Sequence, residues 1–246
     1  MKIFALADLH LSFGRAKPMD VFGELWRDHP ARIAEAWDRA VGPDDVVLVA
    51  GDISWAHTIE EAVPDLEFVA ERPGRLKLLL KGNHDSWWTS AAKVRSRLPP
   101  TLEILRNDAR RLEAGVVVCG ARGWTIPGTE WYEEERDGKL FRRELRRLRM
   151  SLAAAAAVVR PGDLLIAMLH FPPLGPGDRT SEVMELLEAE GVRLAVYGHL
   201  HGEEDHAWAP SGTFRGVELR FVAADFVRFA PVLLYDDGAG TEPAAF

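Results

Sequence analysis

Short apolar runs recur along the chain and alternate with stretches whose apolar residues are spaced three and four apart. Continuous apolar runs rich in leucine and β-branched residues are typical of strands in a sheet that helices cover. We expect strands at residues 2–7, 46–50, 76–80, 116–120, 164–169 and 194–197. Between them, the spacing predicts helices at residues 31–41, 59–70, 90–97 and 181–190. The architecture is therefore expected to be α/β.

The longest helix is predicted at residues 139–159, where four apolar residues share one face and a Pro-Gly pair follows. Its basic residues are the candidate for a local basic patch, but an acidic run precedes them, and we favour a solvated face with compensating charges: Arg142, Arg143, Arg146, Arg147 and Arg149. Further along, residues 217–222 and 231–235 predict antiparallel strands that complete a second sheet.

Three segments show no regular pattern: residues 12–30, 122–138 and 202–216. Each follows a predicted strand or a polar motif, so we expect loops around a site rather than linkers between domains. The loop at residues 122–138 is a candidate lid over that site.

Composition narrows the class of protein. The chain has 246 residues with 47% hydrophobic and 28% charged residues, which fits one folded domain over residues 1–246. Its net charge of -8 argues against nonspecific binding to nucleic acid or anionic membranes. A single cysteine, Cys119, allows no internal disulfide, and no signal peptide or membrane span is evident, so we expect a cytoplasmic protein.

Histidines and aspartates gather in five short blocks, and each block follows a predicted strand. The blocks are Asp8-Leu9-His10, Gly51-Asp52, Gly82-Asn83-His84-Asp85, His170 and Gly198-His199-Leu200-His201. Residues two apart in a strand point to the same side, so Asp8 and His10 can face one metal ion. An isolated pair of this kind is more often a cap and a packed histidine, but five blocks in this order indicate a metal site at the ends of a sheet.

Together the five blocks resemble the motif set of the calcineurin-like metallophosphoesterase superfamily, and they extend over most of the chain, from Asp8 to His201. The resemblance implies a four-layer α-β-β-α sandwich and a dinuclear metal site. It also implies hydrolysis of a phosphoester by a hydroxide that bridges the two metal ions.

The resemblance further implies which residues bind the metals. One ion would be held by Asp8, His10 and His201, the other by Asn83, His170 and His199, with Asp52 bridging them. His84, oriented by Asp85, would contact the phosphate or protonate the leaving oxygen. An alternative for His84 is a histidine that only orients a metal ligand.

The chemistry of these side chains agrees with this assignment. Histidine, carboxylate and amide ligands suit Mn²⁺, Zn²⁺ or iron, with manganese favoured here, and no cysteine lies near the blocks to form a thiolate site. Two divalent ions carry four positive charges, of which Asp8 and Asp52 neutralise two and a hydroxide one more. The remaining positive charge suits an anionic phosphoester.

We therefore expect a metal-dependent hydrolase acting on a small soluble phosphomonoester or phosphodiester. The alternatives are a nuclease or nucleotide pyrophosphatase of the same fold, or a scaffold without catalytic activity. The expected partner is a small-molecule substrate, without nucleic acid or membrane, and the sequence leaves the oligomeric state open.

Two weaker signals concern substrate binding. Trp55, Trp87 and Trp88 lie close to the motifs and can form an aromatic wall of the pocket or pack beneath the metal loops. Arg122 follows a predicted strand and can offer its guanidinium to a phosphate oxygen, although surface arginines are common.

Overall fold

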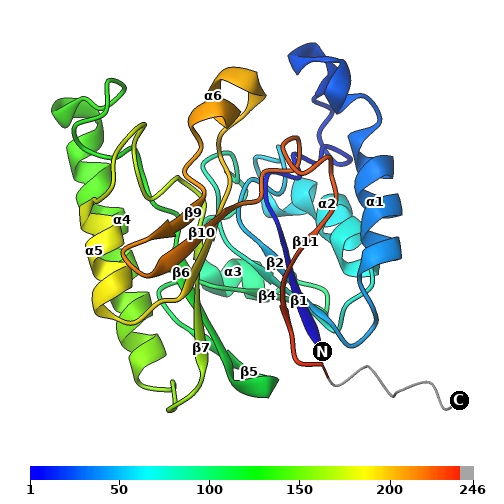
Figure 1. The fold of residues 1–246 in the computed structure, drawn as a ribbon. Helices are drawn as coiled ribbons and strands as arrows, with labels where there is room; N and C mark the ends of the chain where they lie inside the picture. Colours follow the sequence, from blue (N-terminus) through cyan, green and yellow to red (C-terminus); the bar gives the residue numbers. More distant parts are fainter. Residues whose placement is uncertain (239–246) are drawn as a thin grey trace, which may run out of the picture.

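The computed structural model describes residues 1–238 and contains two mixed sheets that face each other between helices (Figure 1). The first sheet has the strand order β11-β1-β2-β3-β4. Its strands are β1 (Lys2–Leu6), β2 (Val46–Val49), β3 (Leu76–Leu79), β4 (Leu102–Ile104) and β11 (Val232–Asp236). Strands β1 to β4 are parallel, and β11 pairs antiparallel with β1.

The second sheet has the strand order β5-β6-β7-β8-β10-β9. Its strands are β5 (Arg110–Leu112), β6 (Val116–Ala121), β7 (Leu164–Leu169), β8 (Leu194–Tyr197), β9 (Gly212–Phe214) and β10 (Val217–Phe221). The inner four strands are parallel, whereas β5 and β9 form antiparallel edges.

Helices cover the outer face of each sheet (Figure 1). The helices α1 (His29–Ala40), α2 (Ile59–Glu71) and α3 (Ala91–Arg95) pack on the first sheet, and α4 (Glu134–Ala156) and α5 (Glu182–Ala189) pack on the second. A sixth helix, α6 (Gly202–Trp208), stands at the edge of the sandwich beyond the carboxyl end of β8 (Figure 1). Short 3₁₀ turns lie at η1 (Asp20–Phe22), η2 (Glu24–Trp26) and η3 (Glu113–Gly115). Helices α2, α3 and α5 each follow a Thr or Ser whose hydroxyl accepts a backbone N–H three residues on. These caps satisfy donors that the first turn of a helix leaves free.

Three apolar layers hold the fold together. One joins the first sheet to α1 and α2 and includes Trp37 and Leu66, and another joins the second sheet to α4 and α5. The third lies between the sheets and mixes side chains from both, such as Leu48 and Ile166. Since each central strand is covered on both faces, its continuous apolar run is explained, and the expected four-layer α-β-β-α architecture is confirmed.

The structure corrects several details of the sequence interpretation. Strand β11 joins the first sheet, and β10 is parallel to β8, so the two last strands are not an antiparallel pair in the second sheet. The segment 202–216 contains α6 and β9, and residues 134–138 already belong to α4, so neither segment is wholly a loop. Strands β4 and β5, three residues each, were not predicted because runs this short carry no clear periodicity.

Within residues 1–238, no helix combines the length and apolar character that crossing a bilayer requires. The five polar blocks all lie just beyond the carboxyl ends of parallel strands, from β1, β2 and β3 in one sheet and β7 and β8 in the other. The fold therefore brings all five to one edge of the sandwich.

Candidate metal centre

The two halves of the site are joined where the ends of β1 and β10 meet. The backbone N–H of Ala7 donates to the carbonyl of Val222 at 2.9 Å, and that of Ala224 donates to the carbonyl of Ala7 at 3.0 Å. Asp8 follows Ala7 directly, so this pairing holds its carboxylate between the two sheets. The N–H of His199 also donates to both oxygens of this carboxylate, at 3.2 and 3.0 Å.

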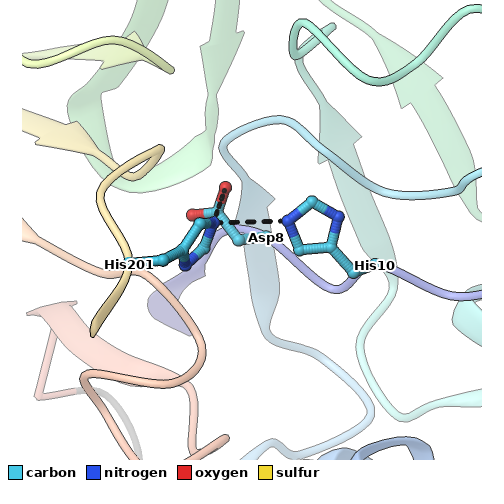
Figure 2. Close-up of side chains that lie close together, drawn as sticks. All are labelled: Asp8, His10 and His201. Carbon is cyan, nitrogen blue, oxygen red and sulfur yellow. Dashed lines mark hydrogen bonds and ion pairs between the residues drawn. The ribbon is translucent and has the colours of Figure 1, made fainter. Parts of the chain in front are cut away.

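One cluster at the centre consists of Asp8, His10 and His201 (Figure 2). The Nε2 atoms of the two histidines lie 3.3 Å apart, and Nε2 of His201 lies 3.6 Å from Oδ1 of Asp8. Ligand atoms about 2 Å from a shared ion lie about 3–4 Å from one another. The spacing of this cluster therefore suits a divalent cation.

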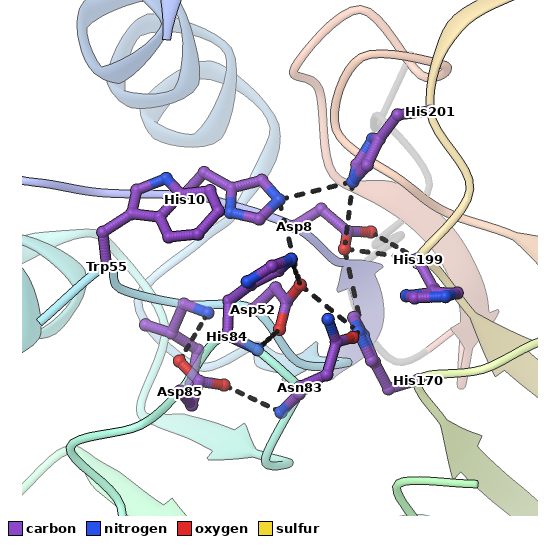
Figure 3. A network of polar contacts seen from close by, with 12 residues as sticks. Asp8, His10, Asp52, Trp55, Asn83, His84, Asp85, His170, His199 and His201 are labelled. Atoms are coloured by element: carbon purple, nitrogen blue, oxygen red, sulfur yellow. Dashed lines mark hydrogen bonds and ion pairs between the residues drawn. The ribbon is translucent and has the colours of Figure 1, made fainter. Parts of the chain in front are cut away.

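A second cluster surrounds Asp52 (Figure 3). Oδ2 of Asp52 lies 3.4 Å from Nε2 of His170 and 3.9 Å from Nε2 of both His10 and His84. This oxygen is buried and has no hydrogen-bond partner. A buried, unpaired carboxylate oxygen is costly unless a cation satisfies it. Its environment fits a metal ion between the surrounding histidines.

His170 and Asn83 lie together on one side of this cluster. Nδ1 of His170 lies 3.1 Å from the carbonyl oxygen of Ala50, which can only accept, so this nitrogen carries a proton. Its Nε2 faces Oδ1 of Asn83 at 2.7 Å. The ring of His199 lies 5.1 Å from the ring of His170 and packs on Phe171 at 3.9 Å, measured between ring centroids. All seven predicted ligand residues thus lie within or directly beside one centre.

The route by which these residues converge differs from the expected one. Asp8, His10, Asp52 and His199 all have positive φ angles, between 45° and 76°. Alternation along an extended strand therefore does not explain how Asp8 and His10 face the same centre. Left-handed backbone at residues other than glycine is strained and gathers at functional sites.

Two glycines of the motifs are needed because ligand carboxylates approach them closely. A Cβ atom on Gly82 would overlap Oδ1 of Asp52, and one on Gly198 would overlap Oδ2 of Asp8. Gly82 and Gly198 are therefore required because a carboxylate from a distant block packs against each of them.

Asp85 does not orient the ring of His84, contrary to the sequence-based expectation. Its Oδ1 accepts the N–H groups of Ile53 and Ser54 and the indole N–H of Trp87, at 2.9 to 3.1 Å, and its Oδ2 accepts the N–H of Gly82. Asp85 thus ties the loop after β2 to the loop after β3. Burial, followed by the nearby Asp52, raises the pKa of its carboxyl to about 6.

His84 lies at the solvent side of the centre. Its side chain is 45% exposed, whereas that of Asp52 is 1% exposed, and its backbone N–H donates to Oδ1 of Asp52 at 2.8 Å. The ring lies 4.3 Å from the ring of Trp55, which also stacks on His10 at 4.7 Å. Burial, partly offset by Asp52, lowers the pKa of His84.

Of the three tryptophans singled out in the sequence, only Trp55 lines the centre. Trp87 and Trp88 are 0% and 1% exposed and pack in the core beneath the metal loops. A different aromatic pair, Trp131 and Trp208, stacks at 5.3 Å beside His199. The sequence pattern did not identify this pair, because one residue lies in an irregular loop and the other on a helix that was not predicted.

Asp225 was also missed. It follows β10, is 4% exposed, and places Oδ1 at 3.0 Å from Nδ1 of His201. It directly follows the apolar run at residues 221–224, which is the same kind of signal that marked the other blocks. It belongs to no motif of the resemblance and was therefore overlooked.

Comparison with known proteins agrees with this geometry. Residues 1–203 match the family model of the calcineurin-like phosphoesterases. The chain is 39% identical over 79 residues to the Gene 66 protein of Mycobacterium phage L5, and 26% identical over 182 residues to a UPF0046 protein of Caenorhabditis elegans. These alignments cover 32% and 69% of the chain, but only 37% and 60% of the two relatives.

A protein of unknown function from Aquifex aeolicus shares the fold. Its crystal structure superposes with a TM-score of 0.50 at 15% identity, covering 94% of this chain and 95% of that one. The matched family model covers most of the chain and contains all five blocks. The chain therefore belongs to the calcineurin-like phosphoesterase family.

Proposed function

We propose that the chain hydrolyses a small soluble phosphomonoester or phosphodiester with the help of two divalent metal ions, manganese being the first choice. The observation that carries this proposal is Oδ2 of Asp52, a buried oxygen without a hydrogen-bond partner that faces Nε2 of three histidines. Asp52 would be shared by both ions. Asp8, His10 and His201 would complete one site, and Asn83, His170 and His199 the other.

Bound at these residues, two divalent ions would polarise the phosphoryl oxygens and activate water near neutral pH. The chain's own groups prepare the site for this task. Burial raises the pKa of Asp52, whereas the charge of His170 lowers it. The net effect is a lowered pKa, so Asp52 is ionised at neutral pH. Burial lowers the pKa of His10 and His199, which keeps both rings neutral and able to bind a metal.

His84 is the proposed proton donor to the leaving oxygen. Its ring is the site histidine most open to solvent, and its backbone is fixed by Asp52, so the imidazole faces the side from which substrate arrives. A histidine in this position can deliver a proton to an alkoxide as the ester bond breaks.

A cavity of about 230 Å³ adjoins His199 and offers room for the organic leaving group of the ester. Phe171, Trp131 and Trp208 supply aromatic walls, and Asp205 lies at its lining. Flat apolar groups pack well on such walls. We therefore propose that the organic part of the ester occupies this cavity while the phosphoryl group lies at the metal centre.

A paired substrate screen tests the proposal. The purified chain is assayed with nitrophenyl phosphate, bis(nitrophenyl) phosphate, alkyl phosphates and cyclic nucleotides, first with manganese and then with excess chelator. The proposal predicts turnover of at least one ester that chelator abolishes and manganese restores. Turnover unaffected by chelator, or none with any ester in the manganese-loaded chain, would contradict it.

The aromatic cavity has its own test. Trp208→Ala should raise KM for nitrophenyl phosphate several-fold and leave KM for a short alkyl phosphate unchanged. Phe13→Ala, which removes an exposed aromatic ring outside this cavity, is the matched control. Equal KM values for the aryl ester in both variants would place the leaving group elsewhere.

A further inference from the structure

A second cavity, of about 190 Å³, lies where the ends of β3 and β6 approach α4. Its charged lining residues are Lys81, Arg106, Arg122, Arg143, Arg147 and Glu144. Five cationic side chains and a single carboxylate thus line one small cavity. None of the seven proposed metal ligands lines it.

Glu144 cannot neutralise the three arginines that surround it. Its Oε1 lies 3.1 Å from Nη2 of Arg122, 3.2 Å from Nε of Arg143 and 2.8 Å from Nη1 of Arg147. All three cations therefore share one oxygen of a side chain that is 1% exposed. The carboxylate orders the guanidinium groups and leaves a net positive charge among them.

The other two cations have uncharged hydrogen-bond partners. Nζ of Lys81 donates to the carbonyl oxygen of Trp88 at 2.6 Å, and Nη1 of Arg106 donates to that of Thr89 at 3.4 Å. Nε of Arg122 is buried and has no hydrogen-bond partner at all. Cations concentrated in a cleft with low-dielectric walls create a field that attracts anions.

The cavity lies close to the proposed metal centre. Lys81 precedes Asn83 by two residues, and the carbonyl of Arg122 accepts the backbone N–H of His170 at 3.0 Å. The same backbone segments therefore carry metal ligands and cavity cations.

We propose that this cavity binds a phosphate group. The guanidinium fork matches the oxygens of a phosphate, and several arginines ordered on one carboxylate lose little freedom when the anion binds. The group is either a second phosphate on the substrate or free inorganic phosphate. A second phosphate on the substrate presupposes the proposed function, whereas the binding of phosphate to this cavity does not.

Calorimetric titration of inorganic phosphate into the full chain, with excess chelator, tests binding without the metal centre. The double variant Arg143→Gln with Arg147→Gln should bind at least about tenfold more weakly than the wild type, because two charged hydrogen-bond donors are lost. Arg146→Gln is the matched control, since Arg146 lies on the same helix but outside the cavity. It should bind like the wild type.

Two outcomes would overturn the proposal: no phosphate binding by the wild-type chain at millimolar concentration, or equal affinities in the double variant and the wild type. Melting temperatures show whether the double variant is folded. If it is not, Arg147→Gln alone provides the same comparison and leaves two arginines on Glu144.

Kinetics of the manganese-loaded enzyme then distinguish the two sources. If the substrate supplies the phosphate, the double variant should raise KM about tenfold for an ester that carries a second phosphate, and not for its singly phosphorylated counterpart. If free phosphate is the ligand, both KM values stay unchanged, and added phosphate alters the wild-type rate more than that of the variant. An enzyme without turnover would contradict the proposed function but would not affect the calorimetric result.

Discussion

Nδ1 of His201 lies 3.0 Å from Oδ1 of Asp225, and this pair connects the ends of β8 and β10 beneath the metal centre. The carboxylate holds the ring so that Nε2 points to Asp8. Burial opposes a charge on His201, but the bonds to Asp225 and Asp8 outweigh it and raise the pKa of His201 to about 10. A metal ion must therefore displace a proton from His201 at neutral pH.

Asp225→Asn should weaken manganese binding about 10- to 100-fold, as is typical when the carboxylate partner of a metal-binding histidine is lost. The variant keeps the shape of the side chain but removes the charge that orients the ring. Glu204→Gln, an exposed carboxylate on the neighbouring α6, should bind manganese like the wild type. Calorimetry of the chelator-treated proteins gives both affinities, and equal values would show that Asp225 does not support the site.

His84→Ala should retain both metal ions and lose about 10²- to 10⁴-fold in kcat, the usual contribution of a general acid. The side chain touches the centre only from its solvent side, at 3.9 Å from Asp52, so its removal should leave the other ligands in place. Metal analysis and steady-state kinetics are measured on the same preparation. Loss of metal from this variant would instead assign His84 to metal binding.

Asp85→Ala should destabilise the fold by about 2–4 kcal/mol and weaken metal binding as well. The carboxylate accepts N–H groups from the loops after β2 and β3, and its removal leaves buried donors unsatisfied. Asp52 and Asn83 lie on those loops, so their positions should change too. Chemical denaturation and metal titration test both effects, and a variant with unchanged stability would refute this role.

Lys77 gives a dependence of stability on pH that does not involve the metal centre. Its side chain is 1% exposed, its amine donates to the carbonyls of Ala70 and Gly74, and burial, followed by Arg72, lowers its pKa to about 8. Between pH 8 and 10.5 the unfolded chain keeps a proton that the folded chain has released. Raising the pH over this range therefore favours the folded state.

Comparison with Lys77→Met isolates this contribution. The stability of the wild type relative to the variant should rise by up to about 3 kcal/mol from pH 8 to pH 10.5 and stay constant below pH 7. Urea denaturation across this range measures the difference. A difference that does not change with pH would mean that the amine keeps an ordinary pKa in the fold.

The blocks that indicated a metal centre were identifiable because each combines a strand end with metal-binding side chains. Asp225 has the same placement after β10 but stands alone, and one carboxylate after one strand is too common to interpret. Its role depends on the pairing of β10 with β8, which brings it to His201. Such long-range pairing leaves no local pattern in the sequence.

The charge pattern along α4 was interpreted correctly only in part, for a related reason. The interpretation as a solvated face with compensating charges is correct for Arg142, which is exposed and pairs with Glu134 at 2.6 Å, and Arg146 and Arg149 are exposed as well. Arg143 and Arg147 turn instead to the buried Glu144 and to a cavity shared with Lys81 and Arg122. Lys81 and Arg122 lie just beyond the ends of β3 and β6, far from α4 in the sequence, so only the packed fold reveals the cluster.

The central claim is tested most directly by titrating manganese into the chelator-treated chain. At each step, the hydrolysis of the ester that the screen finds to be turned over fastest is measured. We predict that the rate rises to its maximum as two manganese ions bind per chain. Asp52→Asn should fail to bind the pair and should show no hydrolysis. Full activity in the metal-free chain, or a chain that binds two manganese ions and hydrolyses no ester, would contradict the account.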